Sequence, residues 1–206
     1  MPSKALTSFE FRLKEIEQLL EAHKLLLQYY KAAAARKNLG WGNLQNALEV
    51  FKHLVTAPGP GRPPQVQALN KAAIALLSGH LQGFITDLYS EAASKILTGH
   101  VSSLQAVTNT APTRRNPSSQ NIKWLFATLG FKDIFAGISW QKCSNEMLHK
   151  RLKDFNELRN KIVHGTSISV TKTTVTSYLS SWTALAQRLD AKLRTEINVL
   201  TGKHPW

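Results

Sequence analysis

The stretch from Asn145 to Gly165, NEMLHKRLKDFNELRNKIVHG, carries the clearest structural pattern in the chain. Its apolar residues recur at steps of three and four, which places them on one face of a helix: Leu148, Leu152, Phe155, Leu158 and Ile162. Ser144 or Asn145 suits the N-cap of this helix, and Gly165 stands where a helix C′ residue is expected. We therefore predict an amphipathic helix over Asn145–His164 that buries one stripe.

The rest of the chain also favours helices. A helix from about Gln65 to Leu97 is apolar all round at its centre, Ala72–Leu77, so we expect it to be the central and most buried helix. Apolar periodicity predicts the remaining helices: Ser8–Lys37, Leu44–Val55, about 122–129, about 133–138, and Thr173 or Thr174 to about Leu200. The predicted fold class is all-α, a bundle of about five to six helices with a long central helix.

Length and composition fit a single helical domain over residues 1–206 with two loops. Proline and glycine predict a loop at 56–65, and a Ser-, Thr-, Asn- and Pro-rich stretch predicts a second, mobile loop at 100–120. Arg114 and Arg115 lie side by side in this second loop. Two interpretations of this loop stay open: a solvated linker and an RNA-binding loop.

Glycine and tryptophan positions give two further expectations. Gly79 and Gly83, inside the long central helix, are expected to allow close approach by a neighbouring helix, at a cost of about 1 kcal/mol each in helix propensity. Trp124, Trp140 and Trp182 fall in apolar contexts, so we expect core positions for them more than base-stacking surfaces. His23, His53 and His149 are expected at the surface or at an edge.

The chain is strongly basic. Lysine and arginine number 26 against 13 aspartate and glutamate, for a formal net charge of +13 and a pI near 10.0. A surplus of this size favours polyanionic partners, of which nucleic acid is the commonest. Charge alone does not separate RNA from DNA or anionic lipid, and a generically basic surface stays open.

Several classes of site and location are excluded or disfavoured by the residues present. Cys143 is the only cysteine, which excludes an intramolecular disulfide and a Cys-rich zinc site. The acidic residues are scattered, with no cluster suited to two-metal catalysis, and no P-loop or Gly-x-Ser-x-Gly string occurs. An apolar signal-peptide core and an apolar run of membrane-spanning length are also missing. We expect a soluble, cytoplasmic protein with no metal and no cofactor.

Three reactive side chains gather near the end of the helix over Asn145–His164. Arg159 lies within the apolar stripe, where its head must reach outward or meet a partner, while Asn160 and His164 are one turn apart on the flank. Arginine can hold a phosphate and stabilise transition-state charge. Histidine at a helix end, where the dipole favours imidazolium, can serve as base and then as acid.

These residues suit metal-free phosphodiester cleavage. Arg159 and His164 would carry the chemistry, and Asn160 would orient the histidine or the phosphate. The pair alone is a weak signal, because histidine in a last helical turn is also an ordinary stabilising choice.

The string from Arg159 to Gly165 resembles the signature of the HEPN superfamily, in which an arginine, a polar residue, spacers and a histidine end a helix. The stretch Ser78–Phe84 in the long central helix resembles the other principal helix of HEPN proteins of the RiboL-PSP type. Those relatives often carry an acidic residue near the position of Gln82, and here Asp87 lies about one turn beyond it. The resemblance covers the helical order from about residue 65 to 200.

The resemblance implies a homodimer that brings two Arg-x4-His motifs together in a basic cleft. Many such proteins are metal-independent endoribonucleases, in which the RNA 2′-hydroxyl attacks the adjacent phosphate to leave a 2′,3′-cyclic phosphate and a 5′-hydroxyl. They recur in toxin–antitoxin and phage-defence systems, which implies an antitoxin or neighbouring defence protein as a further partner.

Together with the charge, the resemblance predicts RNA as the partner. The basic residues predicted to contact the RNA are Lys161, Arg114, Arg115 and Lys153. Two alternatives stay open: a non-catalytic HEPN module that dimerises or binds RNA or protein, and an unrelated helical nucleic-acid-binding protein.

Overall fold

The computed structural model describes residues 1–37, 64–97, 116–141 and 143–206. These ranges contain five helices: α1 (Lys4–Lys37), α3 (Pro64–Ile96), α5 (Ser119–Ala127), α6 (Asn145–Val163) and α7 (Lys172–Thr201). Within the same ranges no strand forms, and one isolated antiparallel bridge joins Trp140 and Cys143. The predicted all-α class is confirmed. The predicted helix Leu44–Val55, with His53, lies outside the described residues.

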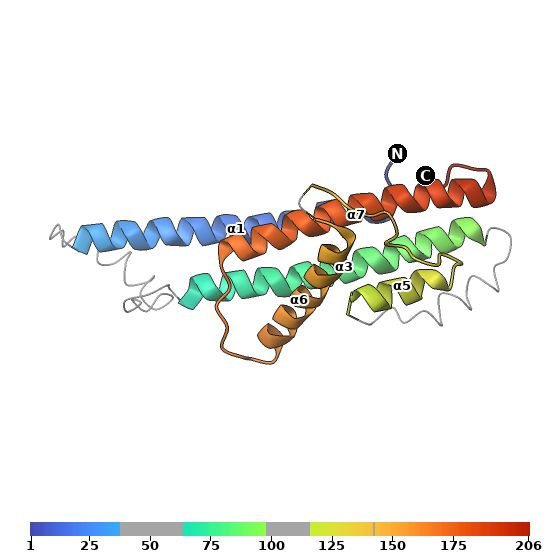
Figure 1. The fold of residues 1–206 in the computed structure, drawn as a ribbon. Coiled ribbons are helices and arrows are strands. Elements are labelled where there is room, and N and C mark those ends of the chain that lie inside the picture. The colour runs from blue at the N-terminus through green and yellow to red at the C-terminus, as the bar shows by residue number, and fades with distance from the viewer. Residues whose placement is uncertain (38–63, 98–115, 142) are drawn as a thin grey trace.

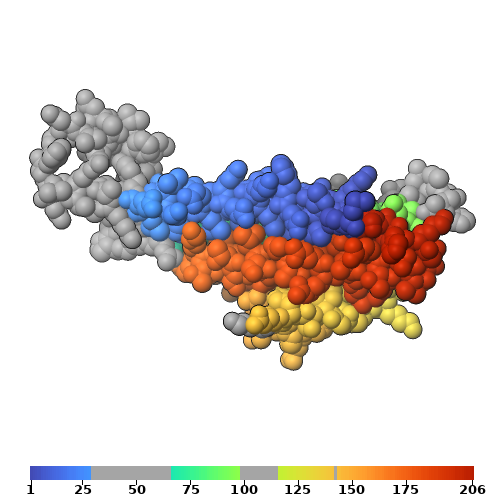
Figure 2. Space-filling view, turned by 90° about the horizontal axis from the view of Figure 1, so that it is seen from above, coloured from blue at the N-terminus to red at the C-terminus, as the bar shows by residue number. Residues whose placement is uncertain are grey.

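The three longest helices run side by side, and the two shorter ones cover one flank (Figure 1). Figure 2 shows α1 and α7 next to each other on one face, with residues 116–163 along the α7 edge. α3 contacts each of the other four described helices. The N- and C-termini lie close together beside α7 (Figure 1).

α3 is central because its apolar side chains form a wide buried face, while a narrower face that includes Ala72, Gly79 and Asp87 is exposed. It contributes more fully buried residues than a helix with a single buried stripe would: Val66, Ala73, Ile74, Leu77, Leu81, Phe84, Ile85, Leu88, Tyr89, Ala92 and Ala93 are all buried. The prediction of a long, central, most buried helix is confirmed.

α6 packs through the stripe that its sequence pattern predicted. Leu148, Leu152 and Phe155 are fully buried, while Leu158 and Ile162 are partly buried against the same core. The Phe155 ring lies 4.8 Å from the Tyr178 ring and 5.1 Å from the Trp182 ring of α7, measured between centroids. Such tilted and edge-to-face contacts add to the gain from burial.

Buried polar groups fasten both chain ends to α7. Asp190 is 4% exposed, and its carboxylate accepts hydrogen bonds from the Ser3 backbone N–H at 3.1 Å and from the Trp206 indole N–H at 3.3 Å. Glu91 of α3 accepts from the backbone N–H groups of Lys4 and Ala5 at 3.3 and 3.1 Å, which satisfies free donors at the start of α1.

Two predicted loop boundaries were placed too far along the chain. Residues 64–65, assigned to the loop 56–65, belong to α3, because proline is well tolerated at the first helical position. Residues 119–120, assigned to the loop 100–120, begin α5, since the Ser118 hydroxyl accepts from the Asn121 backbone N–H at 3.2 Å as an N-cap.

The short helix predicted at 133–138 is wrong, because this segment forms hydrogen-bonded turns. The backbone bonds here join residues three apart, from the Ala136 N–H to Asp133 at 3.1 Å and from the Ile138 N–H to Phe135 at 2.9 Å, so they close single turns and not an α-helix. Gly137 has a φ of 75°, outside the helical region.

The expectations for glycine and tryptophan hold in part. A Cβ at Gly83 would lie 2.5 Å from Nη1 of Arg12, so this glycine does admit a neighbour from α1, whereas nothing lies within 4 Å at Gly79. Trp182 is fully buried, but Trp124 is 50% exposed and is therefore not a core residue.

No helix in the described part of the chain has the length and apolarity needed to cross a membrane.

Replacement of Phe155 by alanine tests the packing of α6 on α7. We expect Phe155→Ala to lower the free energy of unfolding by about 3–5 kcal/mol, because a fully buried aromatic ring leaves a cavity between the two helices. Phe11→Ala is the matched control, since Phe11 is 69% exposed and its loss should change stability by less than about 0.5 kcal/mol. Urea unfolding followed by circular dichroism measures both. Equal losses in the two variants would contradict this packing.

Candidate functional site

The side chains of the N-cap residue and of the first helical residue hold the start of α6. The Ser144 hydroxyl accepts from the Met147 backbone N–H at 3.2 Å as the N-cap. The Asn145 amide donates to the backbone carbonyls of Phe135 at 2.6 Å and Ile138 at 3.3 Å. These bonds orient α6 relative to the turns at 133–138 and therefore set where its far end points.

The far end of α6 closes as the sequence predicted. His164 is the C-cap residue, and Gly165 follows with a φ of 72°. The backbone N–H of Gly165 donates to Ile162 at 3.2 Å, and that of Thr166 donates to Lys161 at 2.9 Å. This pair of bonds is a Schellman motif, which favours glycine because L side chains rarely adopt a positive φ.

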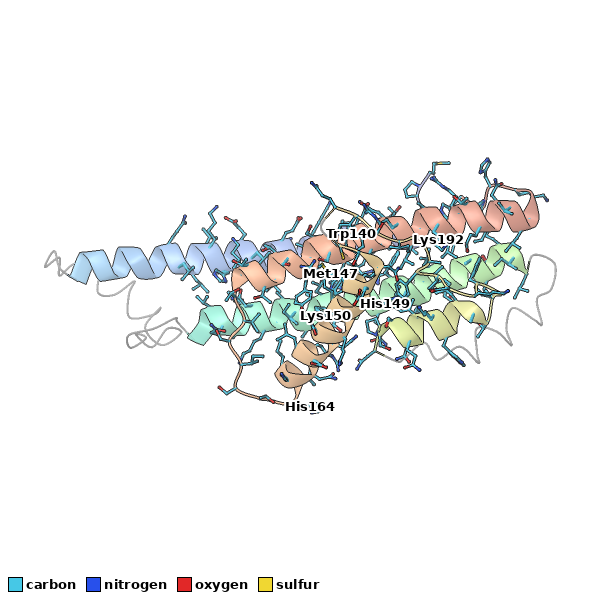
Figure 3. The ribbon with its side chains drawn as sticks, in the orientation of Figure 1. Trp140, Met147, His149, Lys150, His164 and Lys192 are labelled. Carbon is cyan, nitrogen blue, oxygen red and sulfur yellow. The ribbon has the colours of Figure 1, made fainter. Side chains whose placement is uncertain are left out.

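His164 is exposed, and it lies at the free end of α6, away from the packed helices (Figure 3). Its backbone N–H donates to the Asn160 carbonyl at 2.9 Å, so Asn160 and His164 are one turn apart as predicted. The imidazole is thus open to a partner approaching from solvent.

Arg159 and Asn160 are joined directly. Nη1 of Arg159 donates to Oδ1 of Asn160 at 3.2 Å, and both side chains are half-buried. Within the described residues, Arg159 forms no ion pair with an acidic side chain. In the same part of the chain, no hydrogen bond joins the His164 imidazole to Arg159 or Asn160. The fold brings two members of the predicted trio together and leaves the third apart.

Polar side chains of α3 hold Val170, in the segment that follows the motif. Asn70 of α3 donates to the Val170 carbonyl at 2.8 Å, and Gln67 accepts from the Val170 N–H at 2.9 Å. His23 of α1 lies 2.7 Å from Oδ1 of Asn70 through its Nδ1. Because Oδ1 is an acceptor, Nδ1 of His23 carries the proton. His23 is 3% exposed, so its predicted surface position is wrong.

A groove of about 580 Å³ lies between the start of α5 and α6. α6 supplies one wall with polar residues at helical spacing, and the start of α5 supplies the other: Glu146, His149, Lys150, Lys153, Asn156, Glu157 and Asn160, facing Ser118, Ser119 and Gln120. Asn160 therefore belongs both to the motif and to the groove.

His149 is half-buried in this groove, with its ring edge-to-face on Phe135 at 5.1 Å between centroids. Burial lowers the pKa of His149, the positive charge of Lys123 lowers it further, and the negative charge of Asp133 partly offsets this. A histidine with a depressed pKa is mainly neutral at neutral pH and offers one donor and one acceptor. It contributes little positive charge to the groove.

The residues predicted to contact RNA are spread over the site. Lys161 is exposed at the end of α6, and the Lys153 side chain, 76% exposed, lines the groove. Arg114 and Arg115 lie outside the described residues. Among the residues described, no group of three or more His, Cys, Asp or Glu is placed to hold a metal ion.

Sequence reasoning missed most of the groove. His149, Lys150, Asn156 and Gln120 were not predicted as site residues, although the α6 members follow a three- and four-residue spacing opposite the apolar stripe. That spacing is a usable signal for a polar helix face. Nothing in the pattern indicated that the start of α5 would lie across from it.

Comparison with protein families matches residues 43–195, well over half of the chain, to the family described as RiboL-PSP-HEPN. No curated protein and no solved structure matches the chain.

Replacement of Gly165 tests the backbone geometry that ends α6 at His164. We expect Gly165→Ala to lower the free energy of unfolding by about 1–2 kcal/mol, because alanine is strained in the left-handed region. Gly165→Asn should cost less, since asparagine tolerates this conformation better.

Gly79→Ala is the control for that experiment. Gly79 lies within α3 with nothing within 4 Å of the place that a Cβ would occupy, so alanine should stabilise by about 0.5–1 kcal/mol. Chemical unfolding measures all three variants. A Gly165→Ala protein as stable as the Gly79→Ala protein would refute the strained C′ position.

Proposed function

The chain belongs to the RiboL-PSP-HEPN family, and on that premise we propose that it is a metal-independent endoribonuclease. HEPN domains are often ribonucleases, so the family supports a role in RNA or nucleotide chemistry. The narrower proposal rests on the end of α6, where Asn160 holds the half-buried Arg159 and the exposed His164 lies one turn after Asn160.

The chemistry proposed uses one arginine and one histidine from each motif. Arg159 binds the scissile phosphate through its planar fork of donors and stabilises the charge that grows on the phosphoryl oxygens. Asn160 accepts one Arg159 N–H, which restricts the guanidinium and leaves its other donors for the phosphate.

The reaction is an internal transesterification. A base removes the proton of the RNA 2′-hydroxyl, whose oxygen forms a bond to the adjacent phosphorus while the P–O5′ bond breaks. An acid returns a proton to the leaving 5′-oxygen. The products are a 2′,3′-cyclic phosphate and a 5′-hydroxyl, and neither a redox change nor a metal ion is needed for the balance.

A single His164 offers one imidazole for two simultaneous proton transfers, so we propose a homodimer in which both chains contribute a motif. The exposure of His164 at the free end of α6 favours this arrangement, because a second chain can approach it from solvent. Val163, the preceding residue, is 55% exposed and offers apolar surface at the same place.

RNA is the substrate proposed because of charge. The net charge of +13 favours a polyanion, and the exposed side chains of Lys161 and Lys153 lie on the helix that carries the motif. Arg114 and Arg115 are kept as proposed RNA contacts. A role as a toxin or phage-defence effector, with an antitoxin or neighbouring defence protein as partner, follows from the family's usual settings and is part of the proposal.

One observation favours a second candidate, a non-catalytic HEPN module that dimerises or binds RNA or protein. Arg159 is half-buried and already donates one hydrogen bond to a side chain of its own helix. In this alternative the pair is a structural contact, and no cleavage products form under any condition.

RNA cleavage in excess EDTA separates these candidates. We expect the wild-type chain to cleave RNA at an undiminished rate in EDTA and to leave 2′,3′-cyclic phosphate ends detectable by mass spectrometry. His164→Ala should lose about 100-fold or more in rate because proton transfer is removed, and Arg159→Ala about 100- to 1,000-fold because charge stabilisation is removed. His204→Ala is the control, since His204 is exposed but remote in sequence from the motif.

Loss of cleavage in EDTA would refute the metal-free mechanism. Full activity in His164→Ala would refute the role of His164.

Mixing chains tests the shared site. We expect an excess of inactive His164→Ala chains to lower the activity of wild-type chains towards that of the variant, because most wild-type chains would then sit in mixed dimers with one histidine missing. The cleavage rate per wild-type chain is measured at constant wild-type concentration, with His204→Ala chains as the excess in the control. Unchanged activity with the His164→Ala excess would mean that one chain suffices.

A further inference from the structure

The groove between α5 and α6 has features that cleavage at the motif does not use. Its volume, about 580 Å³, falls within the roughly 300–1,000 Å³ typical of small-ligand pockets. It reaches Asn160, whose side chain is bound to Arg159. A nucleotide next to a phosphate held by Arg159 would therefore be close enough to enter it.

The charges that line the groove cancel. Lys150 and Lys153 are opposed by Glu146 and Glu157, and Nζ of Lys153 lies 4.0 Å from Oε1 of Glu157. A surface that follows the phosphate backbone carries an excess of positive charge. This groove is instead a mixture of amides, hydroxyls, carboxylates and a mainly neutral His149, which is the composition of a site that reads a base edge.

Asn156 adds an unused hydrogen-bond acceptor. It lines the groove and is 9% exposed, and its Nδ2 donates to the carbonyls of Leu152 at 2.8 Å and Pro117 at 3.3 Å. These two acceptors fix the orientation of the amide, since the reverse orientation would place oxygen against oxygen. Oδ1 is left without a hydrogen-bond partner in the described structure. Such a buried acceptor is unfavourable while it has no donor. Because Oδ1 is enclosed, a donor from the groove reaches it only when the Asn156 side chain shifts.

We propose that the α5–α6 groove binds the base of the nucleotide beside the scissile phosphate and prefers bases that carry an exocyclic amino group. The exposed carboxylates of Glu146 and Glu157 supply the acceptors, and Oδ1 of Asn156 adds a third when its side chain turns towards the groove. Guanine, adenine and cytosine present such an amino group and uracil does not, so the groove sets a preference in the RNA that is cut. This inference rests on the proposed function for the identity of the ligand as RNA.

The test measures binding of single-stranded RNA to the full-length His164→Ala chain, which is used so that cleavage does not interfere. The probes are fluorescent oligouridines that carry one guanosine or one inosine, and a second pair that carries one adenosine or one purine riboside. Within each pair, the probes differ by a single amino group. Fluorescence anisotropy gives the dissociation constants.

We expect the probe with the amino group to bind about tenfold more tightly than its partner, as a hydrogen bond to a charged acceptor allows. Replacing both carboxylates, Glu146→Gln with Glu157→Gln, should reduce this ratio to about threefold, because an amide oxygen is a weaker acceptor than a carboxylate. Both residues are exposed, so the fold should be retained. Glu21→Gln is the control: Glu21 is exposed, pairs with Lys24 on α1, and should leave the ratio unchanged.

Equal affinity for both members of each pair would overturn the inference, as would an undiminished ratio in the double variant. Tighter binding of every probe by the double variant, with no change in ratio, would show that the groove acts only through charge and would overturn it as well.

The outcomes for the proposed cleavage and for the proposed base site can be told apart. RNA cut by the wild-type chain without discrimination in binding would retain the nuclease and reject the base site. Discrimination by the His164→Ala chain, with no cleavage by the wild type, would retain the base site and reject the nuclease.

Discussion

The wide buried face of α3 is the constraint on which the other helices depend. Its apolar surface cannot be covered by one neighbour, and α1, α5, α6 and α7 all contact it. Because each of them must present an apolar stripe to α3 or to its neighbours, their polar faces are turned outward. The outward position of His164 and Lys161 agrees with that requirement. Asp190 and Glu91 accept hydrogen bonds from the backbone at the start of the chain. These bonds fix the position of the start of α1, which apolar burial alone does not specify.

α6 combines a structural face with a chemical one. Its apolar stripe packs on α7 through Phe155, while the residues between those of the stripe line the groove and end at the motif. Arg159 lies where the two faces meet, half-buried and bound to Asn160. Asn160 therefore belongs both to the groove and to the motif. In the proposed enzyme, this sharing would couple the choice of base to the position of the scissile phosphate.

Predictability from sequence differed sharply between the elements. The C′ position of α6 was predicted correctly at Gly165, which is a local signal for a positive φ, and the helix ends at Val163, one residue before the predicted end. The helix predicted at 133–138 was wrong because Gly137 has a φ of 75° and the backbone bonds join residues three apart, neither of which apolar spacing indicates. His23 was misplaced for a different reason: its partner Asn70 is 47 positions away, and only the packing of α1 on α3 brings the two together. The catalytic roles of Arg159, Asn160 and His164 stay predictions.

Local sequence patterns were sufficient to predict the all-α class, the central helix, the apolar stripe of α6 and the glycine that ends it, because each pattern involves residues within a few turns of one another. The motif from Arg159 to His164 could also be recognised in the sequence, since all of its residues lie at the end of one helix. The folded chain added that His164 stands apart at a free end and that a charge-balanced groove begins beside Asn160. Those features depend on how α5 meets α6 and how Asn145 orients the helix. Contacts between separate elements leave no periodic trace in the sequence.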